Sequence, residues 1–168
     1  MADINILHPP LADGAAEDSA RIRQAIELLF FAYRDFTSDP DVILARSGFG
    51  RAHHRILHFV GAYPGINVAQ LLSILRITKQ SLGRVLSQLL KQGYVEQRPG
   101  QHDKRQRLLY LTAKGRTFGT HLSVQQEERV RKAFDAAGKD AVSGYLQVLE
   151  HLIDVEHRSL ILDTIKRG

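Results

Sequence analysis

Residues 67–98, NVAQLLSILRITKQSLGRVLSQLLKQGYVEQR, decide the fold of this 168-residue chain. Asn67 lies three residues before Gln70, which is the spacing of an N-terminal capping box, and the apolar residues that follow recur at helical intervals. Thr78 can cap a second apolar series, which ends at Gly93, a residue suited to the left-handed conformation found after many helices. The stretch therefore predicts two short helices joined by a tight turn.

The hydrophobic period changes directly after the second helix. Residues 94–98 and 107–111 read as two short strands around a polar loop over 99–106, and basic residues gather at the tip of this hairpin. Two short helices followed at once by a basic hairpin are the parts of a winged helix-turn-helix, in which the second helix enters the major groove of DNA. We therefore expect a mainly α fold with a small β-hairpin wing.

Helical patterns flank this region. Apolar residues recur at amphipathic spacing after Ser19, a candidate cap, and this helix is expected to end near Phe36. The segment 38–40, Ser-Asp-Pro, predicts a break and the start of a short second helix. Residues 47–50, Ser-Gly-Phe-Gly, interrupt the chain again, and a helix with a buried face is expected over 51–62.

Two long, charge-decorated helical patterns follow Thr112, and Gly138 separates them. Their apolar residues exceed what an isolated chain of this kind would cover, which favours a partner. The expected organisation is a flexible N-terminal arm (1–18), a winged helix-turn-helix lobe (51–112), and a helical dimerisation region made of 19–50 and 113–168.

The charge balance favours a polyanionic partner. Lysine and arginine together number 23 against 18 aspartate and glutamate residues, giving a formal charge of +5 and a pI near 9.7. The excess is concentrated in residues 76–107, where only Glu96 and Asp103 are acidic. The absence of cysteine excludes disulfides, thiolate metal sites and thiol redox sensing. No secretory signal or long apolar run is evident, so a cytoplasmic protein is expected.

The second short helix carries the candidate DNA contacts. Its apolar residues define an inward face, and the opposite face and first turn carry long donors and hydroxyls that can reach bases or phosphates. Gly83 lies between them at a cost in helix propensity of about 1 kcal/mol relative to alanine, which suggests close approach to DNA or to a neighbouring helix. The candidate residues on this helix are Thr78, Lys79, Gln80, Ser81, Arg84 and Gln88.

Residues 51–115 resemble the DNA-binding lobe of the MarR family of bacterial transcription regulators, and the flanking helices extend the resemblance over roughly 19–165. The most specific motif is Asp103-Lys104-Arg105 followed by Leu109-Tyr110-Leu111-Thr112-Ala113-Lys114-Gly115, which is similar to the family's wing. Further matching stretches are 64–72, 77–86 and 93–99.

The resemblance implies that Arg105 reaches into the DNA minor groove while Asp103 holds it, with Lys104 beside them. A guanidinium suits the negative potential of a narrow minor groove, and a carboxylate can order it through a bidentate pair. For Lys79 the sequence leaves open whether it contacts a phosphate or a base. The resemblance also implies a homodimer, repression of transcription, and a pseudo-palindromic operator whose half-sites are one DNA turn apart, roughly 34 Å.

Small aromatic effectors bind between the two lobes in that family, which makes a pocket an expectation here. Its candidate lining is Phe30, Tyr33, Phe49, Arg51, His53 and His54. Packing in the core or at a dimer interface is the simpler interpretation of the aromatic residues, and filling an interface or satisfying buried polar groups is the simpler one for the histidines.

Other functions have less support in the sequence. His54 and His58 have a spacing that could place two imidazoles on one helix face, but Arg55 stands where a zinc protease has glutamate, so no metal or cofactor is expected. No nucleophile elbow or phosphate-binding glycine loop occurs, and we expect no enzymatic activity. A winged-helix module that binds proteins, and a metal sensor that uses the histidines, remain alternatives.

Overall fold

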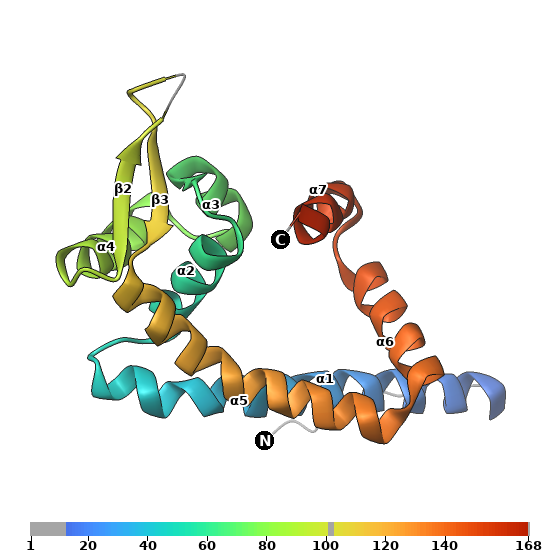
Figure 1. The fold of residues 1–168 in the computed structure, drawn as a ribbon. Helices are drawn as coiled ribbons and strands as arrows, with labels where there is room; N and C mark the ends of the chain where they lie inside the picture. Colours follow the sequence, from blue (N-terminus) through green and yellow to red (C-terminus); the bar gives the residue numbers. More distant parts are fainter. Residues whose placement is uncertain (1–12, 101–102, 168) are drawn as a thin grey trace, which may run out of the picture. The chain divides into compact units, whose positions relative to one another are not determined.

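The computed structural model describes residues 13–100 and 103–167 (Figure 1). Residues up to Phe36 and residues from Thr37 onward form two separate units. In chain order the elements are α1 (Asp13–Arg46), α2 (Arg51–Ala62), β1 (Ile66–Asn67), α3 (Val68–Leu75), α4 (Lys79–Lys91), β2 (Val95–Pro99), β3 (Arg107–Leu111), α5 (Ala113–Ala137), α6 (Lys139–Leu152) and α7 (Val155–Arg167).

The central part of the chain is a winged helix-turn-helix, as the sequence predicts. The β2–β3 hairpin projects beyond helices α2 to α4 (Figure 1). It is antiparallel, with Val95 opposite Leu111 and Pro99 opposite Arg107. The two-residue strand β1 was not predicted, and it adds a third strand by pairing Ile66 with Leu109, in the order β1-β3-β2.

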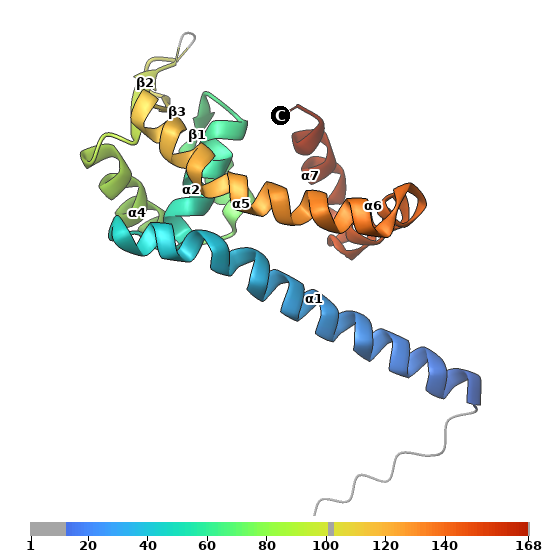
Figure 2. The same ribbon diagram turned by 60° about the horizontal axis from the view of Figure 1, so that its bottom comes forward.

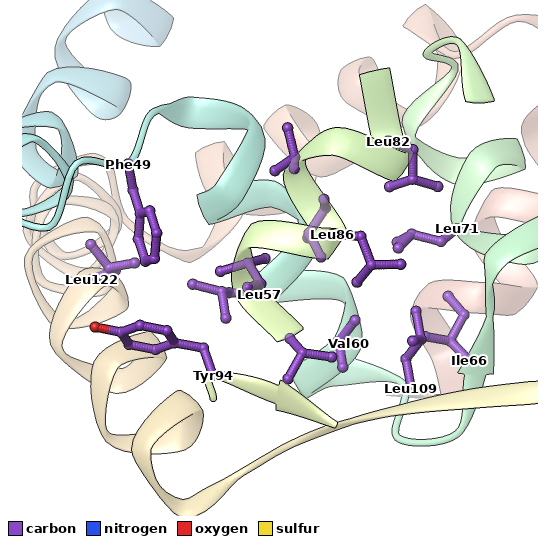
Figure 3. Packing of buried hydrophobic residues seen from close by; sticks show 14 of the residues in the cluster. Phe49, Leu57, Val60, Ile66, Leu71, Leu82, Leu86, Tyr94, Leu109 and Leu122 are labelled. Atoms are coloured by element: carbon purple, nitrogen blue, oxygen red, sulfur yellow. The ribbon is translucent and has the colours of Figure 1, made fainter. Parts of the chain in front are cut away.

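The hydrophobic core of this lobe lies between α2, α3, α4 and the sheet. Figure 3 shows Phe49, Tyr94 and Leu122 at one end of the core and Leu71 and Leu109 at the other. Leu122 comes from α5, so the packed core extends beyond residues 51–112. The capping box at Asn67 and the cap at Thr78 form as predicted, with the Asn67 side chain accepting from the Gln70 N–H at 2.9 Å.

The predicted break at residues 38–40 is wrong, because α1 is one helix with Pro40 inside it (Figure 2). An internal proline costs about 3 kcal/mol in helix stability, and tertiary contacts around Pro40 offset this. The Pro40 and Leu44 side chains are fully buried. Asp39 accepts two hydrogen bonds from the Arg129 guanidinium, at 2.8 and 3.0 Å, and so ties this turn of α1 to α5.

The N-terminal unit consists of the first part of α1. This helix begins at Asp13, so Ser19 is not its cap, and residues 13–18 are helical, contrary to the prediction of an arm. The rest of the predicted arm lies outside the described residues. One face of the helix carries large apolar side chains that are all exposed in this chain: Ile22, Ile26, Leu29, Phe30 and Tyr33.

The C-terminal region contains one more helix than the sequence predicted. Gly138 separates α5 from α6 as expected, but the long final pattern is divided at residues 153–154 into α6 and α7. The Arg158 guanidinium closes this corner, since it donates to the Ile153 carbonyl at 2.9 Å and to the His151 carbonyl at 2.8 Å. Across the described part of the chain, every helix is too short or too polar to span a membrane.

Candidate nucleic-acid interface

Helix α4 presents a polar face with a fixed first turn. The Thr78 hydroxyl accepts from the Ser81 N–H at 3.2 Å and donates to the Ser81 hydroxyl at 2.9 Å, so these two residues organise the start of the helix. The helix buries four apolar side chains against the core: Leu82, Val85, Leu86 and Leu89. Lys79, Gln80 and Arg84 are exposed.

Gln88 differs from the other predicted contacts on α4. Its side chain is half-buried, with Oε1 2.9 Å from Nε2 of His53 on α2 and Nε2 3.4 Å from the Gly48 carbonyl. An amide already engaged inside the protein is not available to read a base without breaking these contacts. Gln88 is therefore engaged within the protein, and its predicted contact with DNA stays a prediction.

Gly83 has open space beside it on α4. A Cβ built there would meet no described atom within 4 Å, so close packing against another helix of this chain does not explain the glycine. Of the two predicted explanations, only close approach to a separate molecule remains.

The base of the wing depends on a glycine in α5. A Cβ at Gly115 would lie 1.9 Å from the Tyr94 carbonyl oxygen, so only glycine fits. The same carbonyl accepts from the Thr112 N–H at 3.1 Å, and the Thr112 hydroxyl accepts from the Gly115 N–H at 3.0 Å. This close approach is the physical basis of the Thr112 to Gly115 motif, and it joins α4, the wing and α5.

Arg98 on β2 is a basic residue of the wing that was not among the candidate contacts. The Arg98 guanidinium lies 4.5 Å from the centre of the Tyr110 ring on the facing strand, and its Nε donates to Glu96 at 3.0 Å. Both contacts hold the guanidinium on the surface of the hairpin, and the Glu96 carboxylate compensates its charge. The sequence places Arg98 and Tyr110 in the two predicted strands of the hairpin. Sequence alone could not show that their side chains pair across the strands.

Residues 103–106 of the wing form a turn organised by Asp103. Its carboxylate accepts from the Arg105 backbone N–H at 2.9 Å, and its carbonyl accepts from the Gln106 N–H at 3.0 Å. Among the described residues, no ion pair joins Asp103 to the Arg105 guanidinium, so the expected bidentate pair is not present. Asp103 shapes the turn, and the Lys104 and Arg105 side chains are exposed.

Two of the six residues predicted to line an effector pocket are buried in the core. Phe49 and His53 are buried, and their rings stack with centroids 4.5 Å apart. Arg51 is engaged in a bidentate ion pair with Asp41, with its shortest contact at 2.7 Å. Phe30 and Tyr33 belong to the N-terminal unit and are exposed there.

His54 and His58 lie one turn apart on α2. Burial lowers the pKa of both imidazoles below the ordinary value of 6.5, and each ring favours its neutral form. For His54 the nearby His58 lowers the pKa further, whereas Asp41 raises it. Within residues 13–100 and 103–167, no three histidine or acidic side chains are placed to hold a metal ion together.

Comparison with known proteins agrees with this geometry. The model of the MarR family matches residues 47–106, which run from the start of the lobe to the wing tip. The HTH-type transcriptional regulator PetP of Rhodobacter capsulatus is 52% identical over 134 residues, which cover 80% of this chain and 81% of that protein. This chain belongs to the MarR family. It is a helix-turn-helix transcription regulator of that family, which is not a family of enzymes.

Solved structures of other proteins share the fold. The MarR family transcription regulator SP03579 superposes with a TM-score of 0.70 at 18% identity, covering 93% of this chain and all of that one. FabT of Streptococcus pneumoniae, in complex with DNA, superposes with a TM-score of 0.67 at 22% identity, covering 78% of this chain and 94% of FabT.

Proposed function

We propose that this MarR-family regulator is a cytoplasmic homodimer that represses transcription by binding a pseudo-palindromic operator. In each protomer α4 enters the major groove, with Lys79, Gln80 and Arg84 toward the DNA, and Arg105 of the wing reaches the adjacent minor groove. Repression follows from occupancy, because a dimer that covers one turn of the duplex excludes other proteins from it.

The exposed polar face of α4 is the observation that carries this proposal. The helix buries four apolar side chains on one side, and the other side holds two cations and a glycine with open space above it. A helix that is both anchored and accessible can enter a groove about 12 Å wide without unfolding its own lobe. FabT, which has this fold, was solved in complex with DNA.

The homodimer is supported by apolar surfaces outside the lobe. Helix α6 buries none of its residues, although its apolar side chains include Tyr145, Leu146 and Leu152. The apolar face of α1 at residues 22–33 is equally exposed. Monomeric proteins rarely leave such apolar surfaces uncovered. In a twofold-symmetric dimer, a second copy of the chain would cover the apolar faces of both α1 and α6.

A small aromatic effector is not part of the proposed mechanism. Phe49 and His53, two of the predicted lining residues, are buried in the core and stack on each other. An effector could act only by binding two conformations of the protein with different affinity.

DNA binding by the full chain tests the proposal. Duplexes are selected from a random-sequence pool with purified protein, and affinity is measured by fluorescence anisotropy at two salt concentrations. The proposal predicts a pseudo-palindromic consensus and an affinity that falls steeply with salt, because binding releases counterions from phosphates. Selection of no duplex at low salt would contradict it and favour a protein-binding module.

A further inference from the structure

A chain of contacts runs from the α1–α2 loop through α2 to the exposed helix α4. His53 is the central residue: its ring is buried, it stacks on Phe49, and its two nitrogens face opposite directions. Nδ1 lies 3.1 Å from the Gly50 backbone nitrogen, and Nε2 lies 2.9 Å from Oε1 of Gln88. The Gln88 amide nitrogen continues the chain to the Gly48 carbonyl at 3.4 Å.

The partners assign the direction of every hydrogen bond in this chain. The Gly50 N–H can only donate, so Nδ1 of His53 is the unprotonated acceptor. The proton of the neutral ring is therefore on Nε2, which donates to Gln88 Oε1. That bond orients the Gln88 amide so that its NH₂ group points to the Gly48 carbonyl, which can only accept. One tautomer and one amide orientation satisfy all three contacts.

We propose that His53 is a positioning residue for DNA recognition, which holds α4 at its angle to α2 through Gln88. This inference rests on the proposed function of α4. His53 lies on α2 and is buried, so it is not itself a DNA contact. It bonds to Gln88, the one polar residue of α4 that is half-buried and not exposed.

The surroundings of Phe49 make this link rigid. Besides His53, the Phe49 ring packs edge-on against Tyr94 at 5.2 Å and against Phe118 on α5 at 5.9 Å. The imidazole is therefore held on its face by an aromatic cluster and at both nitrogens by hydrogen bonds. Leucine contacts of α4 resist its separation from the core, but they are not directional, whereas a hydrogen bond to Gln88 constrains rotation and sliding.

The test is a double-mutant cycle on DNA affinity. The probe is the duplex that the wild-type chain selects from a random-sequence pool, and the variants are His53→Phe, Gln88→Met and the two together. His53→Phe keeps an aromatic ring on Phe49 but leaves the Gly50 N–H and the Gln88 amide without their partner. We expect each single change to weaken binding about tenfold. We expect the double variant to bind DNA no more weakly than the single variant of lower affinity, because each single change already removes the same link between His53 and Gln88.

Two further variants separate positioning from general loss of structure. His53→Gln supplies an acceptor and a donor in place of the two ring nitrogens and should restore most of the affinity. His58→Phe, on the same helix, is the matched control and should bind like the wild type. Urea unfolding of each variant fixes conditions in which all are folded, so that the affinities compare folded proteins.

Several results would overturn the inference. If Gln88→Met weakens binding by the same factor in the wild-type chain and in the His53→Phe variant, Gln88 acts independently of His53 and contacts DNA directly. If His53→Phe binds within about twofold of wild type, the link does not position α4. If His53→Phe does not fold, nitrogen NMR of the wild-type imidazole decides, because a proton on Nδ1 contradicts the assigned link and one on Nε2 supports it. Selection of no duplex by the wild type would overturn the proposed function as well.

Discussion

Helices α4 and α6 are similar in length and amphipathic pattern, but their apolar residues have different surroundings. The 13 residues of α4 bury four apolar side chains, whereas the 14 residues of α6 bury none. In α6, Tyr145, Leu146 and Leu152 are 50%, 48% and 61% exposed. An apolar stripe of this kind gains stability only when it leaves water. The difference indicates that the chain completes the core of its DNA-binding lobe by itself and leaves the apolar stripe of α6 exposed, where the proposed dimer would cover it.

Adding one methyl group in each region should give the largest contrast. Gly115→Ala places Cβ against the Tyr94 carbonyl, and we expect the free energy of unfolding to fall by about 3 kcal/mol. Gly144→Ala is the matched change in α6, where Cβ meets no described atom, and it should raise stability by about 0.5–1 kcal/mol through helix propensity. Urea unfolding measures both. Equal losses would mean that α6 is packed as tightly as the lobe.

A charge on the exposed stripe of α6 should separate the protomers. Leu152→Glu places a carboxylate where the account expects a partner chain, and burying it there would be costly. We expect light scattering at micromolar concentration to give the mass of one chain for this variant and of two chains for wild type. Gln147→Glu, which adds the same charge at an exposed polar position of α6, is the control and should remain dimeric. Dimeric Leu152→Glu would exclude this stripe from the interface.

Removing the Arg105 guanidinium from the wing should have a moderate effect on DNA binding. Arg105→Ala leaves the turn intact, because Asp103 bonds the backbone of Arg105, and it removes only the guanidinium. We expect affinity to fall about tenfold and the slope of log affinity against log salt to decrease by about one. Arg131→Ala on α5, another exposed arginine, should change neither quantity. An unchanged salt slope for Arg105→Ala would place the wing away from the phosphates.

The smallest effect concerns pH. Because the pKa values of His54 and His58 are lowered in the folded chain, the unfolded chain binds more protons as the pH falls. Their contribution to stability is complete above pH 6.5 and is lost as the pH falls through their lower folded-state values. We expect the free energy of unfolding to decrease from pH 7.5 to 5.5, and less so in His54→Gln and His58→Gln than in the control His121→Gln. Identical pH profiles would contradict these shifts.

The sequence predicted the DNA-binding lobe well because its signals are local. These signals each act within a few residues. They are the helix caps at Asn67 and Thr78, the helix end at Gly93 and the change of hydrophobic period at the hairpin. The errors arise where distant contacts override such signals. Pro40 remains helical because its side chain is buried and the neighbouring Asp39 is tied to Arg129, some ninety positions away.

The candidate site shows the same limit. Exposure of Lys79, Arg84 and Arg105 follows from helical and hairpin periodicity, and the sequence placed these residues correctly on the surface. Gln88 occupies a position that periodicity also assigns near the surface, but it pairs with His53, 35 residues earlier in the chain. Two-residue strand β1 is too short to leave a pattern, and the corner between α6 and α7 carries neither glycine nor proline.

The stoichiometry of the complex tests the central claim most directly. Native mass spectrometry of the full chain with its selected duplex should give two chains per duplex, and the selected sequence should repeat with inverted symmetry at a spacing of about 10 base pairs. One chain per duplex on a sequence without internal symmetry would contradict the account.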